Sequence, residues 1–162
     1  MSSETNRVAH AIVRKLIAQG LTVASAESCT GGGIMAALTS VSGSSACVRG
    51  GVVSYATEIK QSVLGVSPKT VTSCGVVSEQ TVIEMARGAL RVMEADVAVS
   101  TSGVSGPSGG TLETPVGTVW MAVAAADGRV TTFKLRGDDL GRWRNTRRAV
   151  LVALKQLEVF IG

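Results

Sequence analysis

Aromatic residues are scarce in this 162-residue sequence. Phe, Trp and Tyr make up 3% of a chain that is 45% hydrophobic, so a buried core must consist mainly of Val, Ala, Leu and Ile. A chain of this length usually folds as one domain and is long enough to bury a hydrophobic core. Because only five aromatic side chains are available for stacking on bases, the sequence argues against nucleic acid as the partner.

Histidine, clustered cysteine and long apolar runs are also lacking. The single histidine, His10, falls in an amphipathic helix away from other candidate site residues, so neither a Ser-His-Asp triad nor a zinc site is predicted. Cys29, Cys47 and Cys74 form no C-x-x-C pair, which is typical of reduced thiols. No apolar run reaches the roughly 20 residues of a membrane span. The first ten residues do not resemble a signal peptide. We therefore expect a cytoplasmic protein that does not bind membranes.

Two common phosphate-binding motifs are missing as well. The glycines at 31–33 are not followed by the Lys and Ser or Thr of a P-loop. The glycines at 103–110 precede a predicted strand, whereas a dinucleotide fingerprint requires a helix there. The net charge of +4 and the pI near 9.3 still permit an anionic partner, either nucleic acid or a phosphorylated metabolite.

The hydrophobic pattern predicts alternating helices and strands. Helices are expected over 4–19, 30–40, 58–64 and 140–160, with two more that begin at Ser67-Pro68 and at Ser78. Strands are expected over 21–26, 48–55, 95–102, 116–126 and 129–136. The last two strands should form a hairpin at Asp127-Gly128. Strands separated by helices and followed by a hairpin predict an α/β fold with a mixed sheet. No linker or repeat divides the chain, so residues 1–162 are predicted to be one domain.

The stretch SAESCTGGG, residues 25–33, follows a buried strand and is the first candidate site. Ser28 would lie at the amino end of the helix predicted over 30–40, where backbone N–H groups stabilise a developing anion. Gly31–Gly33 would let the backbone approach a ligand. The alternative is that Ser28 or Thr30 only caps the helix.

Without a suitable histidine, a serine nucleophile needs a lysine as its base. Lys15 and Lys155 belong to amphipathic helices and Lys134 to an outer strand, whereas Lys60 lies in a segment with few charges. Its pKa would have to fall from about 10.4 towards about 7–8, which desolvation in a glycine-lined pocket can achieve. Glu27 is interpreted as a structural residue bonded to its own turn, and Cys29 as a packing residue.

Two further stretches could hold an anion. Residues 102–117 contain five glycines and two prolines, and so long a loop is often functional, although it could instead be a disordered surface segment. Its N–H groups could surround a phosphate or an oxyanion. Arg144, Arg147 and Arg148 share one face of the last helix and could hold an anion between them. The alternative for these arginines is a solvated basic face.

Five segments together resemble the CinA carboxy-terminal domain family of PncC-type nicotinamide-nucleotide amidases. They read AESCTGG, GGVVSYATEIK, GVVSE, SGVSGPSGGTLETPVGTVW and RGDDLGRWRNTRRAVLVAL, and they begin at residues 26, 50, 75, 102 and 136. The resemblance implies a three-layer α/β/α fold with a mixed five-stranded sheet. It also implies hydrolysis of nicotinamide mononucleotide to nicotinic acid mononucleotide and ammonia in pyridine nucleotide salvage. It further implies a stand-alone form of the domain, no cofactor or metal, and a homo-oligomer, with a dimer expected.

The resemblance also assigns residues. Ser28 matches the nucleophile, Lys60 the base that takes its proton, and Tyr55 a residue that lines the pocket or positions Lys60. The substrate-binding residues are expected to be Thr30, Gly31, Gly32, Ser102, Gly103, Gly106, Gly109, Gly110 and Arg144. Arg144 would meet the substrate phosphate, with Arg142 or Arg147 in its place if the helical register differs.

The sequence departs from the family pattern near these residues. This sequence has Ala56-Thr57 where the family commonly has Ser-Asn, Val104-Ser105 where it has Ile-Ala, and Ser108 where it has Gly or Asp. These differences could change the substrate preference or the rate. Two other functions stay open: a nucleotide-binding module without hydrolysis, and a DNA-binding or competence-related partner protein.

Overall fold

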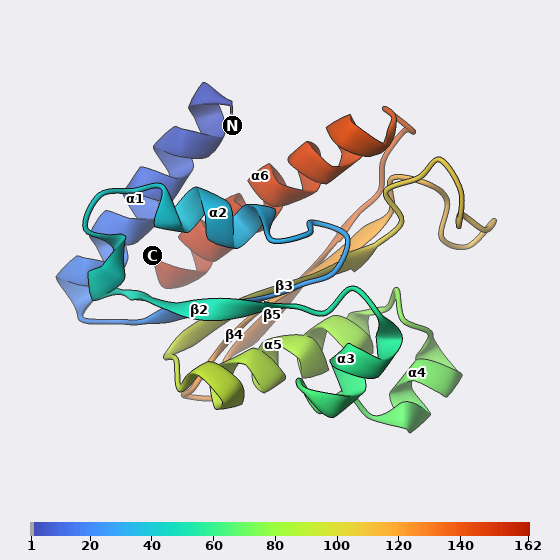
Figure 1. Cartoon of the computed structure of the whole chain (residues 1–162), viewed down its shortest axis with the longest axis horizontal. Coiled ribbons are helices and arrows are strands. Elements are labelled where there is room, and N and C mark those ends of the chain that lie inside the picture. The colour runs from blue at the N-terminus through green and yellow to red at the C-terminus, as the bar shows by residue number, and fades with distance from the viewer. Residues whose placement is uncertain (1) are drawn as a thin grey trace.

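A five-stranded sheet forms the centre of the computed structural model, which describes residues 2–162 (Figure 1). The strands are ordered β2-β1-β3-β4-β5 across the sheet. Strand β1 is parallel to both of its neighbours, whereas β4 is antiparallel to β3 and β5. Their bounds are Val23–Glu27 for β1, Val48–Val53 for β2, Val97–Gly103 for β3, Val119–Ala125 for β4 and Val130–Leu135 for β5. The predicted mixed sheet is confirmed.

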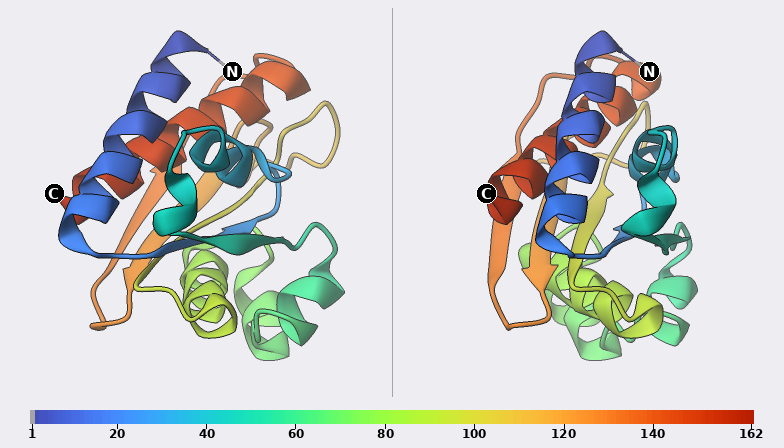
Figure 2. Two further views of the ribbon diagram at one scale, coloured as in Figure 1. Left: turned by 60° about the vertical axis from the view of Figure 1, so that its left-hand side comes forward. Right: turned by 90° about the vertical axis from the view of Figure 1, so that its left-hand side faces the viewer.

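Helices cover both faces of the sheet and complete the expected three layers (Figures 1 and 2). One face carries α1 (Ser3–Gln19), α2 (Gly33–Thr39) and α6 (Arg142–Ile161). The other carries α3 (Thr57–Ser62), α4 (Pro68–Cys74) and α5 (Glu79–Met93), and a short 3₁₀ turn at Ser44–Ala46 was not predicted. None of the six α-helices within residues 2–162 has the length and apolar character that a bilayer crossing requires.

The predicted helix starts at Ser67-Pro68 and Ser78 are correct. The hydroxyl of Ser67 accepts the N–H of Lys69, and that of Ser78 accepts the N–H of Thr81. Two other starts were predicted too early. Helix α2 begins at Gly33 and not at residue 30, because Gly31 and Gly32 have φ of 61° and 91°. Likewise, Gly141, with φ of 84°, delays the start of α6 to Arg142. Such left-handed backbone interrupts a helix, and glycine adopts it without strain.

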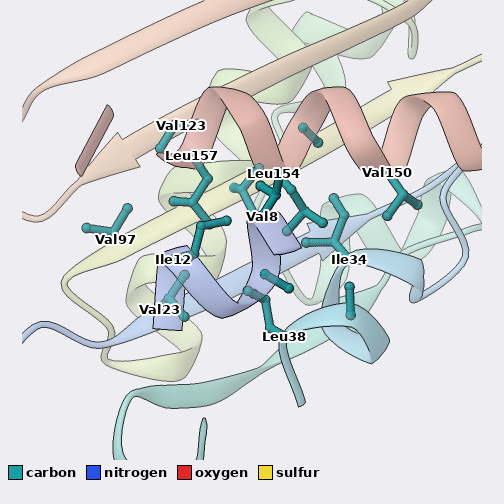
Figure 3. Close-up of a cluster of buried hydrophobic side chains, with 14 of the residues drawn as sticks. Val8, Ile12, Val23, Ile34, Leu38, Val97, Val123, Val150, Leu154 and Leu157 are labelled. Atoms are coloured by element: carbon teal, nitrogen blue, oxygen red, sulfur yellow. The ribbon is translucent and has the colours of Figure 1, made fainter. Parts of the chain in front are cut away.

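The larger part of the core lies between the sheet and helices α1, α2 and α6 (Figure 3). It is aliphatic, as the composition predicts, and its labelled members are Val8, Ile12, Val23, Ile34, Leu38, Val97, Val123, Val150, Leu154 and Leu157. Burial of each Leu or Ile side chain in this core stabilises the folded state by about 1.5–3 kcal/mol. On the opposite face α5 packs on Ala24, Ala26 and Ala98, whose small side chains allow a close approach of helix and sheet.

This architecture brings several chain segments together at one edge of the sheet. Strands β1, β2 and β3 are parallel and all end there, and the loop 104–118 that leaves β3 projects from the same side (Figure 1). The first turn of α6 lies beside this loop, since Asn145 donates to the carbonyl oxygen of Ser105 at 3.0 Å. In parallel α/β sheets the carboxyl ends of the strands are the usual place for a ligand.

Candidate active site

A cavity of about 380 Å³ opens at this edge. Its walls come from the turn after β1, the β2–α3 segment, residues 76–77, the end of β3, the loop 104–118 and the start of α6. The lining residues are Ser28, Cys29, Tyr55, Thr57, Lys60, Val76, Val77, Ser102, Gly103, Val104, Ser105, Gly106, Ser108, Gly109 and Arg142. No carboxylate belongs to this lining in the described part of the chain.

Ser28 is held at the end of β1 by the neighbouring strand. Its backbone N–H donates to the carbonyl oxygen of Thr101 in β3 at 3.0 Å, and the hydroxyl groups of Thr30 and Thr101 bond at 2.8 Å. The left-handed Gly31 and Gly32 then turn the chain into α2. Ser28 is 8% exposed, so its hydroxyl is reached through the cavity.

Glu27 is the last residue of β1, and its side chain lies on the face of the sheet that α2 covers. Its buried carboxylate accepts the backbone N–H groups of Ile34 and Met35, at 3.0 and 2.9 Å, and the hydroxyl of Ser25 at 3.1 Å. Glu27 therefore satisfies two of the unbonded N–H groups at the amino end of α2. The structural interpretation of Glu27 is correct, although the N–H donors that it binds belong to α2.

Lys60 lies in α3 and is 2% exposed. Its Nζ lies 3.0 Å from the Oγ of Ser28, close to the carbonyl oxygen of Ser54, and 3.4 Å from that of Tyr55. All three neighbours are uncharged. Burial lowers the pKa of Lys60, because an ammonium without a carboxylate beside it is poorly solvated here.

The neutral amine suits these three contacts. Its two N–H groups can donate to the carbonyl oxygens of Ser54 and Tyr55, which leaves the lone pair for the hydroxyl hydrogen of Ser28. The neighbouring thiol does not compete as a nucleophile, since burial raises the pKa of Cys29 to about 12. The arrangement can thus remove a proton from Ser28 and return it to a leaving group.

Tyr55 and Arg142 close one side of the cavity. The guanidinium of Arg142 donates to the Tyr55 hydroxyl at 2.6 Å and to the carbonyl oxygen of Gly106 at 2.7 Å. Both of these acceptors are neutral, so the charge of Arg142 is available to an anion in the cavity. The backbone carbonyl oxygen of Tyr55 faces Lys60, while its side-chain hydroxyl accepts from Arg142, and the residue as a whole is 61% exposed.

The first half of the loop 104–118 is fixed to α6. The amide of Asn145 donates to the carbonyl oxygen of Ser105 and to Asp139, while its oxygen accepts the N–H of Leu140 at 3.1 Å. The hydroxyl of Ser105 lies 3.4 Å from the carbonyl oxygen of Cys29, next to Ser28. Thus the first half of the loop forms a wall of the cavity that is held by hydrogen bonds to α6 and to the turn after Ser28.

Not every predicted site residue reaches the cavity. Ser28, Tyr55, Lys60, Ser102, Gly103, Gly106 and Gly109 line it, whereas Thr30, Gly31, Gly32, Gly110 and Arg144 do not. Thr30 lies on the far side of its turn, where it borders a smaller cavity of about 130 Å³ against α1 and α6. Gly31 and Gly32 shape the turn, and Gly110 packs against Val116.

Of the arginines that the sequence offered on the last helix, Arg142 lines the cavity and Arg144 does not. Because α6 begins at Arg142, the side chain of this first helical residue lies over the cavity. Arg144 is two positions further, about 200° around the helix, and is exposed. Asn145, Thr57 and the pair Val76-Val77 were not predicted. Nothing in the local sequence distinguishes them, since an Asn inside a helix is usually a surface residue.

Known proteins match the chain over nearly its whole length. The sequence profile of the CinA C-terminal domain family matches residues 5–161. The nicotinamide-nucleotide amidohydrolase PncC of Enterobacter agglomerans is 54% identical over 119 residues, which cover 74% of this chain and 73% of that protein. The PncC of Shigella flexneri is 46% identical over 132 residues, covering 82% and 80%. The crystal structure of the competence/damage inducible protein CihA from Agrobacterium tumefaciens matches with a TM-score of 0.96 at 40% identity, covering 99% and 97%.

Proposed function

The chain belongs to the CinA C-terminal domain family, and we propose that it hydrolyses nicotinamide mononucleotide to nicotinic acid mononucleotide and ammonia. The observation that carries the proposal is the 3.0 Å separation of Lys60 Nζ and Ser28 Oγ in a cavity. Relatives named nicotinamide-nucleotide amidohydrolase at 54% and 46% identity support the same reaction. The enzyme would act in pyridine nucleotide salvage.

In the proposed acylation step Ser28 attacks the carboxamide carbon. Neutral Lys60 takes the hydroxyl proton as the bond from Oγ to carbon forms. The ammonium then gives this proton to the departing nitrogen, so that ammonia leaves and an acyl-serine remains. The lowered pKa of Lys60 supports this role, since a base has to be unprotonated near neutral pH.

The oxyanion formed in this step needs N–H donors. Those of Ile34 and Met35 in α2 are bonded to Glu27, so the helix end itself is not available. In the turn after β1, the N–H groups of Cys29, Thr30 and Gly32 bond to no acceptor oxygen within residues 2–162, and of these three residues only Cys29 lines the cavity. We assign the oxyanion to this turn, where one good donor contributes about 3–4 kcal/mol.

The substrate phosphate is assigned to Arg142. Its guanidinium has neutral partners, and Gly106, Ser108 and Gly109 line the same cavity. An arginine that faces a phosphate forms strong, charge-assisted hydrogen bonds.

Ammonia release from nicotinamide mononucleotide tests the proposal. Wild type should turn over, while Ser28→Ala and Lys60→Met should each lose about a thousandfold or more in kcat. Cys29→Ala is the matched control, because this residue also lines the cavity and adjoins Ser28. It should keep activity within a few-fold. A wild type that binds the nucleotide without releasing ammonia would instead be the binding module that the sequence left open.

A further inference from the structure

The cavity is lined by two basic side chains but by no acidic one. Lys60 and Arg142 line it, and no Asp or Glu does so within residues 2–162. The four ion pairs among these residues, Lys15–Glu158, Arg49–Glu94, Arg129–Asp127 and Lys155–Glu4, involve neither Lys60 nor Arg142. Any negative charge beside Lys60 therefore has to come with the ligand.

The proposed reaction, on which this inference rests, creates such a charge. During deacylation a water oxygen bonds to the acyl carbon, and the bond between that carbon and Ser28 Oγ breaks. Lys60 transfers one water proton to Oγ, and the second proton stays on the acid that forms. This acid ionises and gives its proton to the Lys60 amine. Each turnover thus ends with a carboxylate beside the ammonium of Lys60.

The ammonium has a strong preference for this partner. Its other neighbours are the Ser28 hydroxyl and the carbonyl oxygens of Ser54 and Tyr55, none of which carries a charge. Burial disfavours the lone ammonium, whereas a carboxylate at hydrogen-bond distance in a poorly solvated site attracts it strongly. A neutral carboxamide supplies no such attraction.

We propose that the cavity is a proton-linked carboxylate site, which binds the acid product more tightly than the amide substrate and takes up one proton at Lys60. The acid competes with the amide for the enzyme, so the reaction is inhibited by its own product. Inhibition is stronger at lower pH, where the proton is available. The ligand class is an aromatic monocarboxylate that also carries a phosphate for Arg142.

Lys60 is the group that takes this proton, because its Nζ lies beside the Ser28 hydroxyl, where the carboxylate forms. The Cys29 thiol stays neutral, since its pKa is raised to about 12. Arg142 is a permanent cation whose guanidinium binds the Tyr55 hydroxyl. Of the nearby acids, Glu27 binds α2, Glu79 accepts the Thr132 hydroxyl, and Glu58 is exposed on α3 outside the lining.

Steady-state kinetics of wild type give the first test. The inhibition constant of nicotinic acid mononucleotide is measured between about pH 6 and about pH 9. It should lie below KM at low pH and rise about tenfold per pH unit above the pKa of Lys60. The kcat/KM for the amide should rise with pH below this same pKa and level off above it. An inhibition constant that does not change with pH, or that exceeds KM at low pH, overturns the inference.

Binding calorimetry on Ser28→Ala, which cannot form the acyl-enzyme, gives the second test. At a pH above the pKa of Lys60, calorimetry in buffers of different ionisation enthalpy should show that the acid binds with uptake of about one proton and the amide with none. Adding Lys60→Met should abolish the uptake and weaken acid binding at low pH about tenfold or more, with amide binding nearly unchanged. Amide binding also reports that this variant is folded. Lys69→Met, at an exposed lysine of α4, is the control and should change neither.

The outcomes distinguish the two proposals. If wild type releases ammonia but the acid binds no more tightly than the amide, only the carboxylate site is wrong. If no ammonia forms and neither mononucleotide binds, the proposed function and the carboxylate site fail together.

Discussion

The Nζ of Lys60 and the Oγ of Ser28 lie 3.0 Å apart, although 32 positions separate the two residues in the chain. Ser28 follows β1 and Lys60 belongs to α3, which follows the neighbouring parallel strand β2. Parallel pairing thus places both residues at one edge of the sheet. The lysine is buried there without a countercharge, so the contact that supports chemistry also costs stability.

Replacement of Lys60 by methionine should therefore stabilise the protein. Burial lowers the pKa of Lys60 in the folded state, so between this pKa and about 10.4 the unfolded chain binds a proton that the folded chain does not. The free energy of unfolding therefore rises with pH between these two pKa values. Below the pKa of the folded state, the full cost of burying the Lys60 ammonium lowers stability. Lys60→Met should raise the free energy of unfolding near neutral pH by on the order of 1 kcal/mol. Urea unfolding at two pH values measures both effects. A less stable variant would contradict the argument.

Arg142 and Arg144 should differ sharply when each is replaced by alanine. Arg142 lines the cavity and Arg144 is exposed on another side of α6. Loss of a charge-assisted contact costs about 1.5–3 kcal/mol, so Arg142→Ala should raise KM roughly tenfold to a hundredfold with a smaller effect on kcat. Arg144→Ala should stay within about twofold of wild type. Equal effects of the two substitutions in steady-state kinetics would show that Arg142 does not contact the substrate.

Glu27→Gln should destabilise the fold even though the shape of the side chain is nearly kept. The carboxylate accepts three hydrogen bonds, and the amide nitrogen of glutamine would face an N–H of Ile34 or Met35. Leaving a buried donor without an acceptor costs about 1–3 kcal/mol. Urea denaturation measures the loss. The exposed Glu58 provides the control, and Glu58→Gln should be nearly neutral.

Gly88 is required by close packing between α5 and the segment that follows α3. A methyl group at this position would overlap the carbonyl oxygen of Leu64. Gly88→Ala should therefore lower stability by about 1–3 kcal/mol. It should also reduce kcat, because the displaced backbone lies four residues after Lys60. Thermal unfolding and ammonia release measure the two effects. Arg87→Ala, at an exposed neighbour on the same helix, should leave both nearly unchanged.

The residue pattern predicted the mixed α/β sheet and favoured Ser28 and Lys60 for identifiable reasons, whereas the three layers were implied by the resemblance to the CinA family. Periodicity locates long elements well, and an almost complete lack of histidine leaves lysine as the base for a serine. The uncharged stretch around Lys60 then separates this lysine from those on amphipathic helices. Periodicity and the uncharged stretch around Lys60 involve residues that are close together in the sequence, and the histidine argument depends only on composition.

The details that could not be predicted depend on where two helices begin. Gly31 and Gly32 delay α2, so its end binds Glu27 and does not adjoin Ser28 directly. In the same way Gly141 starts α6 at Arg142, which decides which arginine reaches the cavity. A run of glycines permits several starts, and only the packed structure selects one. The role of Asn145 is likewise invisible in the sequence, because its partners lie on a distant loop.

The β4–β5 hairpin offers an attachment point for labels and fusions. Its tip, Asp127-Gly128, adjoins the end of β4 that pairs with Val97, whereas the cavity lies at the opposite end of β3, where Gly103 pairs with Val119. A strand of seven residues, or roughly 20 Å, separates the two. A fluorophore, affinity tag or surface tether inserted at this tip would leave the mouth of the cavity unobstructed. The protein could thus be immobilised in one orientation with its site facing the solution.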